Sequence, residues 1–386
     1  MKSNTIIPRA VANRIQERLF QGKALILLGP RQSGKTTLVQ EILQGSGARY
    51  TILNCDEPDI RELLEGSTST RLKSVIGASR IVCIDEAQRI PNIGLTLKLF
   101  TDQIPDVQAI ATGSSSLELN SSIAEPLTGR KFEFTLHPLS FEELSTHHGL
   151  LQERRFLEHR LIYGNYPEVV TSPGQEEELI RLLAGSYLFK DLLTLEGIKK
   201  PSLLEKIVKA LALQLGSEVS YQEVGNTVGA DSHTVERYID LLEKAFVLFR
   251  VPAYSRNVRN EIKKGKKIYF LDNGVRNAII GNFLPLASRT DTGALWENYL
   301  VAERFKMLSS KGVHASASFW RTTQQQEIDY IEEQGQNLLA CEFKWSAAKK
   351  KSRFPATFLR SYPQAMTMVV TPGDYDHFLT ERFFSV

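Results

Sequence analysis

The chain has 386 residues, of which 42% are hydrophobic and 24% are charged, and its formal net charge is +3. These proportions indicate a globular protein that is long enough for two to four domains. The small positive charge permits contact with nucleic acid but is no argument for it. The three cysteines, Cys55, Cys83 and Cys341, are an odd number at spacings that match no zinc site or disulfide framework.

The sequence gives no sign of a membrane partner. No apolar run approaches the length of a membrane-spanning helix, and residues 1–9 lack the apolar region of a secretory signal. We therefore expect a cytoplasmic protein. No internal repeat or low-complexity tract is visible.

The most informative stretch is GPRQSGKT at residues 29–36, which has the form G-x-x-x-x-G-K-T and follows the apolar run 24–28. A buried strand, a glycine-rich loop and then a helix over residues 36–43 form the context that a P-loop, or Walker A motif, needs. Lys35 would reach the β- and γ-phosphates, and the Thr36 hydroxyl would ligate Mg²⁺. The predicted nucleotide-binding residues are Gly29, Pro30, Arg31, Gln32, Ser33, Gly34, Lys35, Thr36 and Thr37.

Two segments flank this motif. Residues 6–19 have apolar side chains at helical spacing with three arginines between them, and they predict a short helix that covers the nucleotide edge: Arg9, Arg14 and Arg18. Residues 49–54 predict a second strand that ends in polar residues. There, Asn54 and Asp56 either face the phosphate site or belong to a surface loop.

The stretch IVCIDE at residues 81–86 predicts a buried strand whose end carries two carboxylates, as in a Walker B motif. Behind a P-loop, Asp85 would hold Mg²⁺ through water. Glu86 would polarise the water that attacks the γ-phosphate. The pair is informative because it follows a complete P-loop.

The next predicted strand, at residues 107–115, also ends in small polar residues. A hydroxyl at this position would hydrogen-bond the γ-phosphate or the attacking water. Ser114 is our first choice for this role and Thr112 the second. The alternative is an ordinary turn at the end of a strand.

Four stretches, GPRQSGKTTL, IVCIDEAQRIPN, AIATGSSSLEL and EPLTGRKFEFTLHPLSFEEL, resemble the AAA+ superfamily, in particular prokaryotic ATPases with a C-terminal nuclease-like domain. The likeness extends through GNYPEVV and KIYFLDNG, so it covers nearly the whole chain. The resemblance implies ATP binding, Mg²⁺-dependent hydrolysis and a ring-like or otherwise closed homo-oligomer. It matches Arg130 to the arginine that touches the γ-phosphate, in its own site or a neighbour's. The alternative is a surface arginine without a role.

The middle of the chain predicts helices. Residues 141–194 form helical patterns joined by Gly-Pro loops, which suit the lid that follows an AAA+ core. His147 and His148 have no carboxylate or cysteine at ligand spacing, so they are expected to be a solvated pair.

Residues 203–251 have the pattern of a winged helix-turn-helix. The helix from His233 would present His233, Thr234 and Arg237 to DNA, but three acidic residues on it would oppose phosphates: Glu236, Asp240 and Glu243. A joint between domains or subunits is the alternative. Six nearby basic residues are either an electrostatic footprint for DNA or a solvated hairpin tip: Arg256, Arg259, Lys263, Lys264, Lys266 and Lys267.

The last module combines a helix over residues 293–300 with strands that carry charged residues. Because side chains alternate along a strand, Glu327 and Asp329 lie on one face of their strand. Glu342 and Lys344 likewise lie on one face of the next strand. A hairpin would bring these faces together as in the D…E-x-K arrangement of PD-(D/E)xK nucleases, with Glu297 as an extra ligand of a second divalent metal. The alternative is a structural ion pair. Basic residues that follow would track a phosphate backbone: Lys349, Lys350, Lys351 and Arg353.

Together these patterns predict an α/β protein with four parts: an AAA+ P-loop core (1–138), a helical lid (139–200), a winged helix (201–262) and a restriction-endonuclease-like α/β domain (263–386). The main hypothesis is an ATPase with ATP and Mg²⁺ as cofactors, whose nucleotide state moves its C-terminal modules. The alternatives are an ATP-licensed, metal-dependent DNA nuclease and a non-catalytic assembly or toxin-antitoxin-type scaffold that binds a partner protein.

Overall fold

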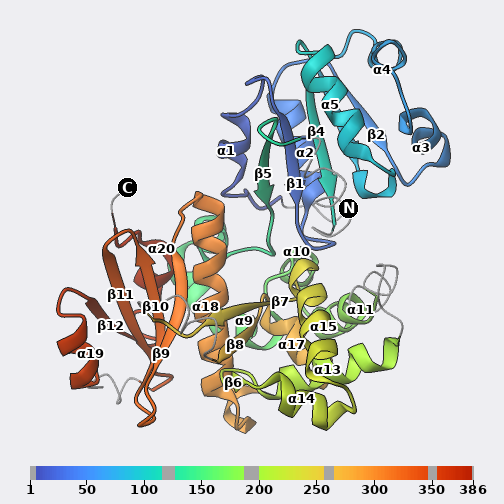
Figure 1. Cartoon of the computed structure of the whole chain (residues 1–386). Coiled ribbons are helices and arrows are strands. Elements are labelled where there is room, and N and C mark those ends of the chain that lie inside the picture. The colour runs from blue at the N-terminus through green and yellow to red at the C-terminus, as the bar shows by residue number, and fades with distance from the viewer. Residues whose placement is uncertain (1–5, 115–126, 187–199, 256–264, 347–353, 385–386) are drawn as a thin grey trace. The chain divides into compact units, whose positions relative to one another are not determined.

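The computed structural model describes residues 6–114, 127–186, 200–255, 265–346 and 354–384 (Figure 1). The chain divides into two compact units. The first contains residues 1–139 with 244–246, and the second contains residues 140–243 with 247–386. Predicted features at residues 256–264 and 349–353, including Arg256, Arg259, Lys263 and Lys264, lie outside the described residues.

A five-stranded sheet in the order β2-β3-β4-β1-β5 forms the centre of the first unit, and every neighbouring pair is parallel. Its strands are β1 (Ala24–Leu28), β2 (Tyr50–Asn54), β3 (Ile81–Asp85), β4 (Gln108–Gly113) and β5 (Lys131–Thr135). All five residues of β1 are buried, as the unbroken apolar run predicts for a strand covered on both faces. The predicted α/β class and the first four strands are confirmed, whereas β5 was not expected.

Helices cover both faces of this sheet. On one face, Leu25 and Leu27 pack with α1 (Ala12–Gln16) and α2 (Lys35–Gly45). The opposite face packs with α3 (Pro58–Leu64), α4 (Ser69–Ile76) and α5 (Ile93–Gln103).

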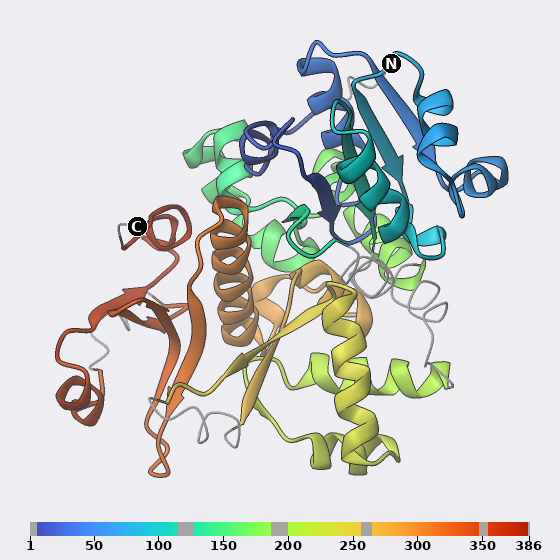
Figure 2. The ribbon, with the colours of Figure 1, turned by 45° about the horizontal axis from the view of Figure 1, so that its top comes forward.

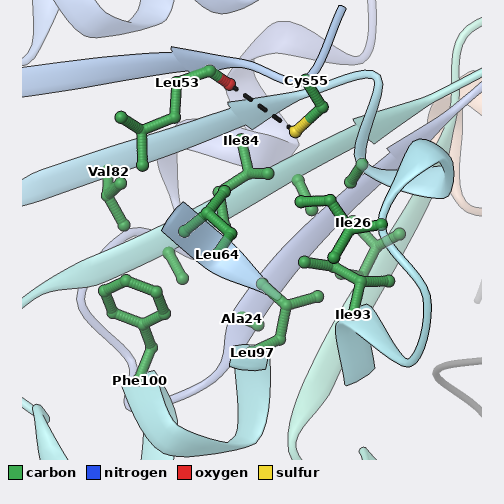
Figure 3. Close-up of a cluster of buried hydrophobic side chains, with 14 of the residues drawn as sticks. Ala24, Ile26, Leu53, Cys55, Leu64, Val82, Ile84, Ile93, Leu97 and Phe100 are labelled. Atoms are coloured by element: carbon green, nitrogen blue, oxygen red, sulfur yellow. Dashed lines mark hydrogen bonds between the residues drawn. The ribbon is translucent and has the colours of Figure 1, made fainter. Parts of the chain in front are cut away.

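Figure 3 shows the core on this second face, where the Sγ atom of buried Cys55 lies 4.0 Å from the Leu53 carbonyl oxygen. Cys83 is buried in the core of the first face. Both cysteines are therefore small core residues, as expected for Cys83. The helix predicted over residues 6–19 is shorter than expected, because the chain turns after α1 and Phe20 adopts a φ of 59°.

The second unit is mainly helical in its first half. The helix α7 (Phe141–His148) begins at Ser140 in a capping box with Glu143. The helices that follow are α8 (Leu150–Arg155), α9 (Leu157–Tyr163), α10 (Pro167–Thr171), α11 (Glu176–Ser186), α13 (Pro201–Leu213), α14 (Tyr221–Val228) and α15 (Ser232–Lys244). The helices predicted as a lid thus lie in this unit, and the predicted boundaries between its modules stay predictions.

Two sheets complete the second unit. The first is antiparallel in the order β6-β8-β7, from β6 (Glu218–Val219), β7 (Leu248–Pro252) and β8 (Lys266–Phe270). The second has the order β12-β11-β10-β9, from β9 (Ser316–Arg321), β10 (Glu327–Gln334), β11 (Asn337–Phe343) and β12 (Met366–Val370). The remaining helices are α17 (Asn273–Ile280), α18 (Thr292–Lys311), α19 (Ala356–Ser361) and α20 (Tyr375–Thr380).

The long helix α18 packs beside both of these sheets (Figures 1 and 2). Its Arg304 donates to both carboxylate oxygens of Glu332 in β10, at 2.7 Å each. Its Asn298 accepts from the Phe270 N–H of β8 at 2.8 Å and donates back to the Phe270 carbonyl at 2.9 Å. Buried polar groups thus fix the position of α18 against the two sheets.

The motifs GNYPEVV and KIYFLDNG meet in the interior of this unit. Asp272 accepts from the N–H of Val275 at 3.1 Å, which caps α17, and from the N–H of Asn165 at 2.7 Å. A Cβ on Gly164 would lie 2.0 Å from Asp272 Oδ1, so only glycine fits there. These motifs therefore hold the helices of the unit together. No helix in the described residues is long and apolar enough to cross a membrane.

Candidate functional site

The P-loop connects β1 to α2, and its backbone requires glycine at positions 29 and 34. Gly29 lies so close to Leu136 that a Cβ would be 2.1 Å from the Leu136 carbonyl oxygen. Gly34 caps α2 with a φ of 94°, and Gln32 has a φ of 58°. These left-handed residues turn the loop sharply before the helix, as an anion-binding loop requires.

Lys35 is buried at the start of α2. Its ammonium group donates to the carbonyl oxygens of Gly29 and Pro30, each at 2.9 Å, so it lies across the mouth of its own loop. The Ser33 hydroxyl is fully buried and has no hydrogen-bond partner within the described part of the chain. The loop therefore offers a cation and an unsatisfied hydroxyl, which fit a polyphosphate.

Asp85, at the end of β3, accepts hydroxyl groups on both of its carboxylate oxygens. Thr36 Oγ1 donates to Oδ2 at 3.2 Å, and Thr112 Oγ1 of β4 donates to Oδ1. Hydroxyl and carboxylate oxygens are the hard ligands that Mg²⁺ prefers, so Thr36 and Asp85 fit the predicted magnesium site.

Glu86 follows Asp85 in a left-handed backbone conformation with a φ of 54°. Its N–H donates to Thr112 Oγ1 at 3.2 Å, which helps to hold this unusual conformation. Gln88 donates from Nε2 to a carboxylate oxygen of Glu86 and, at 3.0 Å, to Ser114 Oγ. The Ser114 hydroxyl itself lies 3.5 Å from Glu86 Oε2.

Both hydroxyls weighed from the sequence thus belong to the site, in different places. Thr112 contacts Asp85, whereas Ser114 contacts Glu86 and Gln88. Gln88 was not expected, because a glutamine two residues after a carboxylate pair carries no sequence signal of its own.

Comparison with known proteins agrees with this geometry. Residues 21–145 match the model of a family described as AAA domain. These residues form an AAA-type P-loop domain. Residues 154–285 match a domain of unknown function, DUF8612, and residues 292–386 match another, DUF4143.

Two relatives that align over most of the chain are described as uncharacterized proteins. An uncharacterized protein of Mycobacterium tuberculosis is 26% identical over 385 residues, which are 98% of this chain and 83% of that protein. One of Haemophilus influenzae is 26% identical over 340 residues, 81% of this chain and 80% of that protein. The solved Walker-type ATPase of Pyrococcus abyssi superposes with a TM-score of 0.50 at 17% identity, covering 72% of this chain and 97% of that one. That likeness concerns the fold alone.

Arg130 does not lie with the other predicted residues of the AAA domain. Its carbonyl accepts from the N–H of Ala24, the first residue of β1, at 2.9 Å. The P-loop leaves the other end of β1, a five-residue strand, and a strand rises about 3.3 Å per residue, so the four steps between its first and last residues span roughly 13 Å. Arg130 instead donates from Nε to Asp102 Oδ1 at 2.8 Å, and this bond lowers the pKa of Asp102.

Asn54 and Asp56, for which two interpretations were open, lie beside the AAA site. Asn54 pairs with Asp85 across the sheet. Its Oδ1 accepts the Asp56 N–H at 3.0 Å, and Asp56 forms an ion pair with Arg89. These contacts are those of a polar loop.

The C-terminal carboxylates surround a lysine that comes from another sheet. Lys267 of β8 is almost fully buried and donates to Glu297 Oε1 at 2.9 Å. It also lies 2.6 Å from Glu327 Oε1. Burial lowers the pKa of Lys267, but Glu297 and Glu327 raise it by more, so the ammonium stays charged. Tyr269 OH donates to the same Glu297 oxygen at 2.7 Å.

The predicted D…E-x-K residues lie next to this lysine. Lys344 Nζ is 2.6 Å from Glu342 Oε2 and 3.8 Å from Asp329 Oδ2. The Phe343 N–H donates to Asp329 Oδ2 at 2.7 Å. Burial raises the pKa of Asp329, and burial together with Asp329 raises the pKa of Glu342.

These contacts do not fit the second metal that the sequence predicts. Lys344 belongs to the predicted D…E-x-K pattern itself, but Lys267 adds a second ammonium group, which contacts both Glu297 and Glu327. In the described ranges, no three histidine, cysteine, aspartate or glutamate side chains are grouped so that they could hold a metal ion. The predicted ligands are therefore ion-paired with lysines in this arrangement. Glu297 pairs with Lys267, and Asp329 and Glu342 pair with Lys344.

All three acidic residues of α15, the helix that the sequence offers for reading DNA, form ion pairs with basic residues of β7 and β8. Arg250 of β7 lies 2.7 Å from Asp240 Oδ1 and also pairs with Glu243. Lys266 lies 4.0 Å from Glu236. A groove of about 460 Å³ runs along the turn between α14 and α15, with Thr234 and Arg237 in its lining.

Proposed function

We propose that this protein is an ATPase that binds ATP with Mg²⁺ at the P-loop and hydrolyses it. One observation carries the proposal. The hydroxyls of Thr36 and Thr112 each donate a hydrogen bond to one carboxylate oxygen of Asp85, and Thr36 directly follows the P-loop lysine. Bound Mg²⁺ would neutralise charge on the β- and γ-phosphates.

The roles of the other residues follow from their positions. Lys35 exchanges its bonds to the loop carbonyls for the phosphates. Glu86 orients the attacking water and accepts its proton. Gln88 and Ser114 hold the Glu86 carboxylate in place. Because they are hydrogen-bonded to Glu86 and to each other, their contacts change when Glu86 acts in hydrolysis.

Phosphate release by the purified protein tests this proposal. Release that requires both ATP and Mg²⁺ and stops with EDTA supports it. No release, together with no ATP binding by the folded protein, contradicts it.

The second unit is proposed to respond to the nucleotide. We interpret the helices α13 to α15 with the sheet β6-β8-β7 as a winged helix, whose exposed Arg237 would meet DNA or a protein partner. Closed homo-oligomers remain part of the proposal, because Arg130 lies too far from its own P-loop to serve it. Arg130 would then contact the γ-phosphate in the P-loop site of a neighbouring chain.

An ATP-licensed nuclease is the alternative function for the second unit. It is favoured by the close approach of Asp329, Glu342 and Lys344. The ion-paired lysines favour instead a platform that binds without cutting. Incubation of supercoiled plasmid with protein, ATP and Mn²⁺ separates the two: nicking that disappears in Asp329→Ala establishes the nuclease, and intact plasmid supports the platform.

A further inference from the structure

Arg9 joins the P-loop to the segment that leaves the AAA domain. The side chain precedes α1 and is largely buried, with 9% of its surface exposed. Its NH1 group donates to the Ser33 carbonyl at 2.6 Å, and its NH2 group donates to the His137 carbonyl at 2.6 Å. These partners lie 24 and 128 residues away in sequence, so one guanidinium connects three separate segments.

The bond to Ser33 fixes the direction of a peptide group in the loop. In a planar trans peptide, the carbonyl of Ser33 and the N–H of Gly34 point in opposite directions. Because Arg9 holds the carbonyl, the Gly34 N–H is turned away from Arg9 and is left for an anion at the start of α2. Gly34 also lies close to the guanidinium, since a Cβ there would be 3.5 Å from Arg9 NH1.

The bond to His137 reaches the segment after β5. This segment is also bonded to the residue that precedes the loop, because the Leu136 N–H donates to the carbonyl of Leu28, the last residue of β1, at 2.7 Å. The Leu136 carbonyl in turn occupies the space that a side chain at Gly29 would need. The P-loop and residues 136–139 are therefore held side by side, and the chain passes from the first unit to the second after Leu139.

We propose that Arg9 is a positioning residue for the triphosphate, which orients the Gly34 N–H toward the phosphates and transmits the filling of the loop to residues 136–139. This inference rests on the proposed ATP site. The proposed route lies within the first unit and leads from the bound nucleotide to residues 136–139, where the chain leaves that unit. Hydrogen bonds to a charged donor are among the stronger ones, so their loss should be measurable.

The test compares Arg9→Met and Arg9→Lys with a matched control, Arg18→Met. Arg18 belongs to the same N-terminal segment, is exposed and donates to Gln21. The affinities for ATP and for adenosine are measured by calorimetry, and amide hydrogen exchange of residues 29–38 and 136–139 is followed with and without ATP. Thermal unfolding confirms that each variant is folded.

We expect Arg9→Met to weaken ATP binding roughly tenfold to a hundredfold and to leave adenosine affinity unchanged, because only phosphate contacts are lost. Arg9→Lys should lie between, since an ammonium can keep one of the two bonds. ATP should slow exchange at residues 136–139 in the wild type and the control but not in Arg9→Met. An equal loss for ATP and adenosine, or unchanged ATP affinity in a folded Arg9→Met protein, would overturn the proposal.

Failure of the ATPase proposal itself gives a different result. If the wild type binds no ATP, the exchange rates without nucleotide still report on Arg9. Faster exchange of residues 29–38 in Arg9→Met than in Arg18→Met then supports the positioning of the loop. Equal rates overturn it.

Discussion

Thr36 and Asp85 are 49 residues apart in sequence, yet the Thr36 hydroxyl donates to Asp85 Oδ2 over 3.2 Å. The strands β1 and β3 that bring them together are not neighbours, because β4 lies between them in the sheet. Thr112 of that middle strand donates to the other oxygen of Asp85. The ends of β3 and β4 and the start of α2 thus meet at one carboxylate, at the edge of the sheet where its parallel strands end.

We expect Lys35→Ala to remove ATP binding without unfolding the protein, because it deletes the cation opposite the β- and γ-phosphates. Binding of a fluorescent ATP analogue measures the effect, and circular dichroism monitors the fold. Lys73→Ala is the control, since Lys73 is exposed on α4. Unchanged ATP affinity in a folded Lys35→Ala protein would contradict the P-loop assignment.

For Glu86→Gln we expect normal ATP binding and a loss of turnover of roughly a hundredfold or more, because the amide keeps the shape of the carboxylate but accepts no proton. Phosphate release and ATP binding are measured on the same protein. The exposed Glu65 provides the control variant Glu65→Gln. Turnover near that of the wild type would show that Glu86 is not the catalytic carboxylate.

The sequence predicts the P-loop site more completely than the C-terminal carboxylate cluster. The P-loop and the Asp85–Glu86 pair could be predicted, because motif and strand pattern are local properties. The choice of Ser114 over Thr112 as the hydroxyl that bonds the γ-phosphate or the attacking water stays a prediction, and it is the fully buried Thr112 that contacts Asp85. Both residues lie at the end of β4, so which hydroxyl reaches Asp85 depends on the register of β4 against β3, which pairs Ile84 with Ala111 and is not written in any single segment.

In the C-terminal cluster, the sequence pattern of single strands predicts some of the contacts but not those between sheets. Alternation along β10 and β11 correctly brought Asp329 near Glu342 and Lys344. It gave no sign of Lys267, which enters from another sheet. The register of β10 against β9 also shifts between Ile328 and Ile331, at the position of Asp329, and period-two reasoning does not anticipate such a bulge.

If Arg130 completes a neighbouring chain's site, two inactive variants should restore each other. Arg130→Ala keeps Glu86, and Glu86→Gln keeps Arg130, so a mixed oligomer contains some intact sites. We expect phosphate release to rise on mixing, above the sum of the two separate activities. No rise, once subunit exchange has been shown by labelled chains, would leave Arg130 as a structural partner of Asp102.

Glu297 should make the stability of the second unit depend on pH. Burial raises its pKa from 4.5 to about 7, although Lys267 opposes the rise. A carboxyl group whose pKa is raised in the folded state contributes stability that is complete below its unfolded pKa and is lost as the pH rises through the folded value. We therefore expect the free energy of unfolding to fall by on the order of 2 kcal/mol between about pH 4.5 and 7.

Urea unfolding at several pH values checks this dependence. All three tryptophans, Trp296, Trp320 and Trp345, lie in the second unit, so their fluorescence follows its unfolding. Glu297→Gln should flatten the fall, because its amide does not titrate. The exposed Glu205 supplies Glu205→Gln, which should keep the wild-type slope. A wild-type slope in Glu297→Gln would assign the pH dependence to other groups.

The last prediction concerns the cation among the C-terminal carboxylates. The Lys267 ammonium is 2.9 Å from Glu297 Oε1 and 2.6 Å from Glu327 Oε1, in the place of a metal. Carboxylates this close repel one another unless a positive charge lies between them. We therefore expect the wild-type cluster to bind no Mn²⁺. The Lys267→Met variant should either bind Mn²⁺, or be less stable than the wild type and regain that stability when Mn²⁺ is added.

Calorimetry with Mn²⁺, without nucleotide, makes the measurement on the full chain. All proteins carry Asp85→Asn, so that the P-loop site takes no metal. Lys73→Met is the matched control for the loss of a lysine, and the double variant Lys267→Met with Asp329→Ala shows whether bound Mn²⁺ depends on the cluster. Mn²⁺ binding that is present with Lys267 intact and vanishes in Asp329→Ala would contradict the expectation and return the metal-dependent nuclease to first place. Binding that appears only when Lys267 is removed would identify this lysine as the residue that keeps the cluster free of metal.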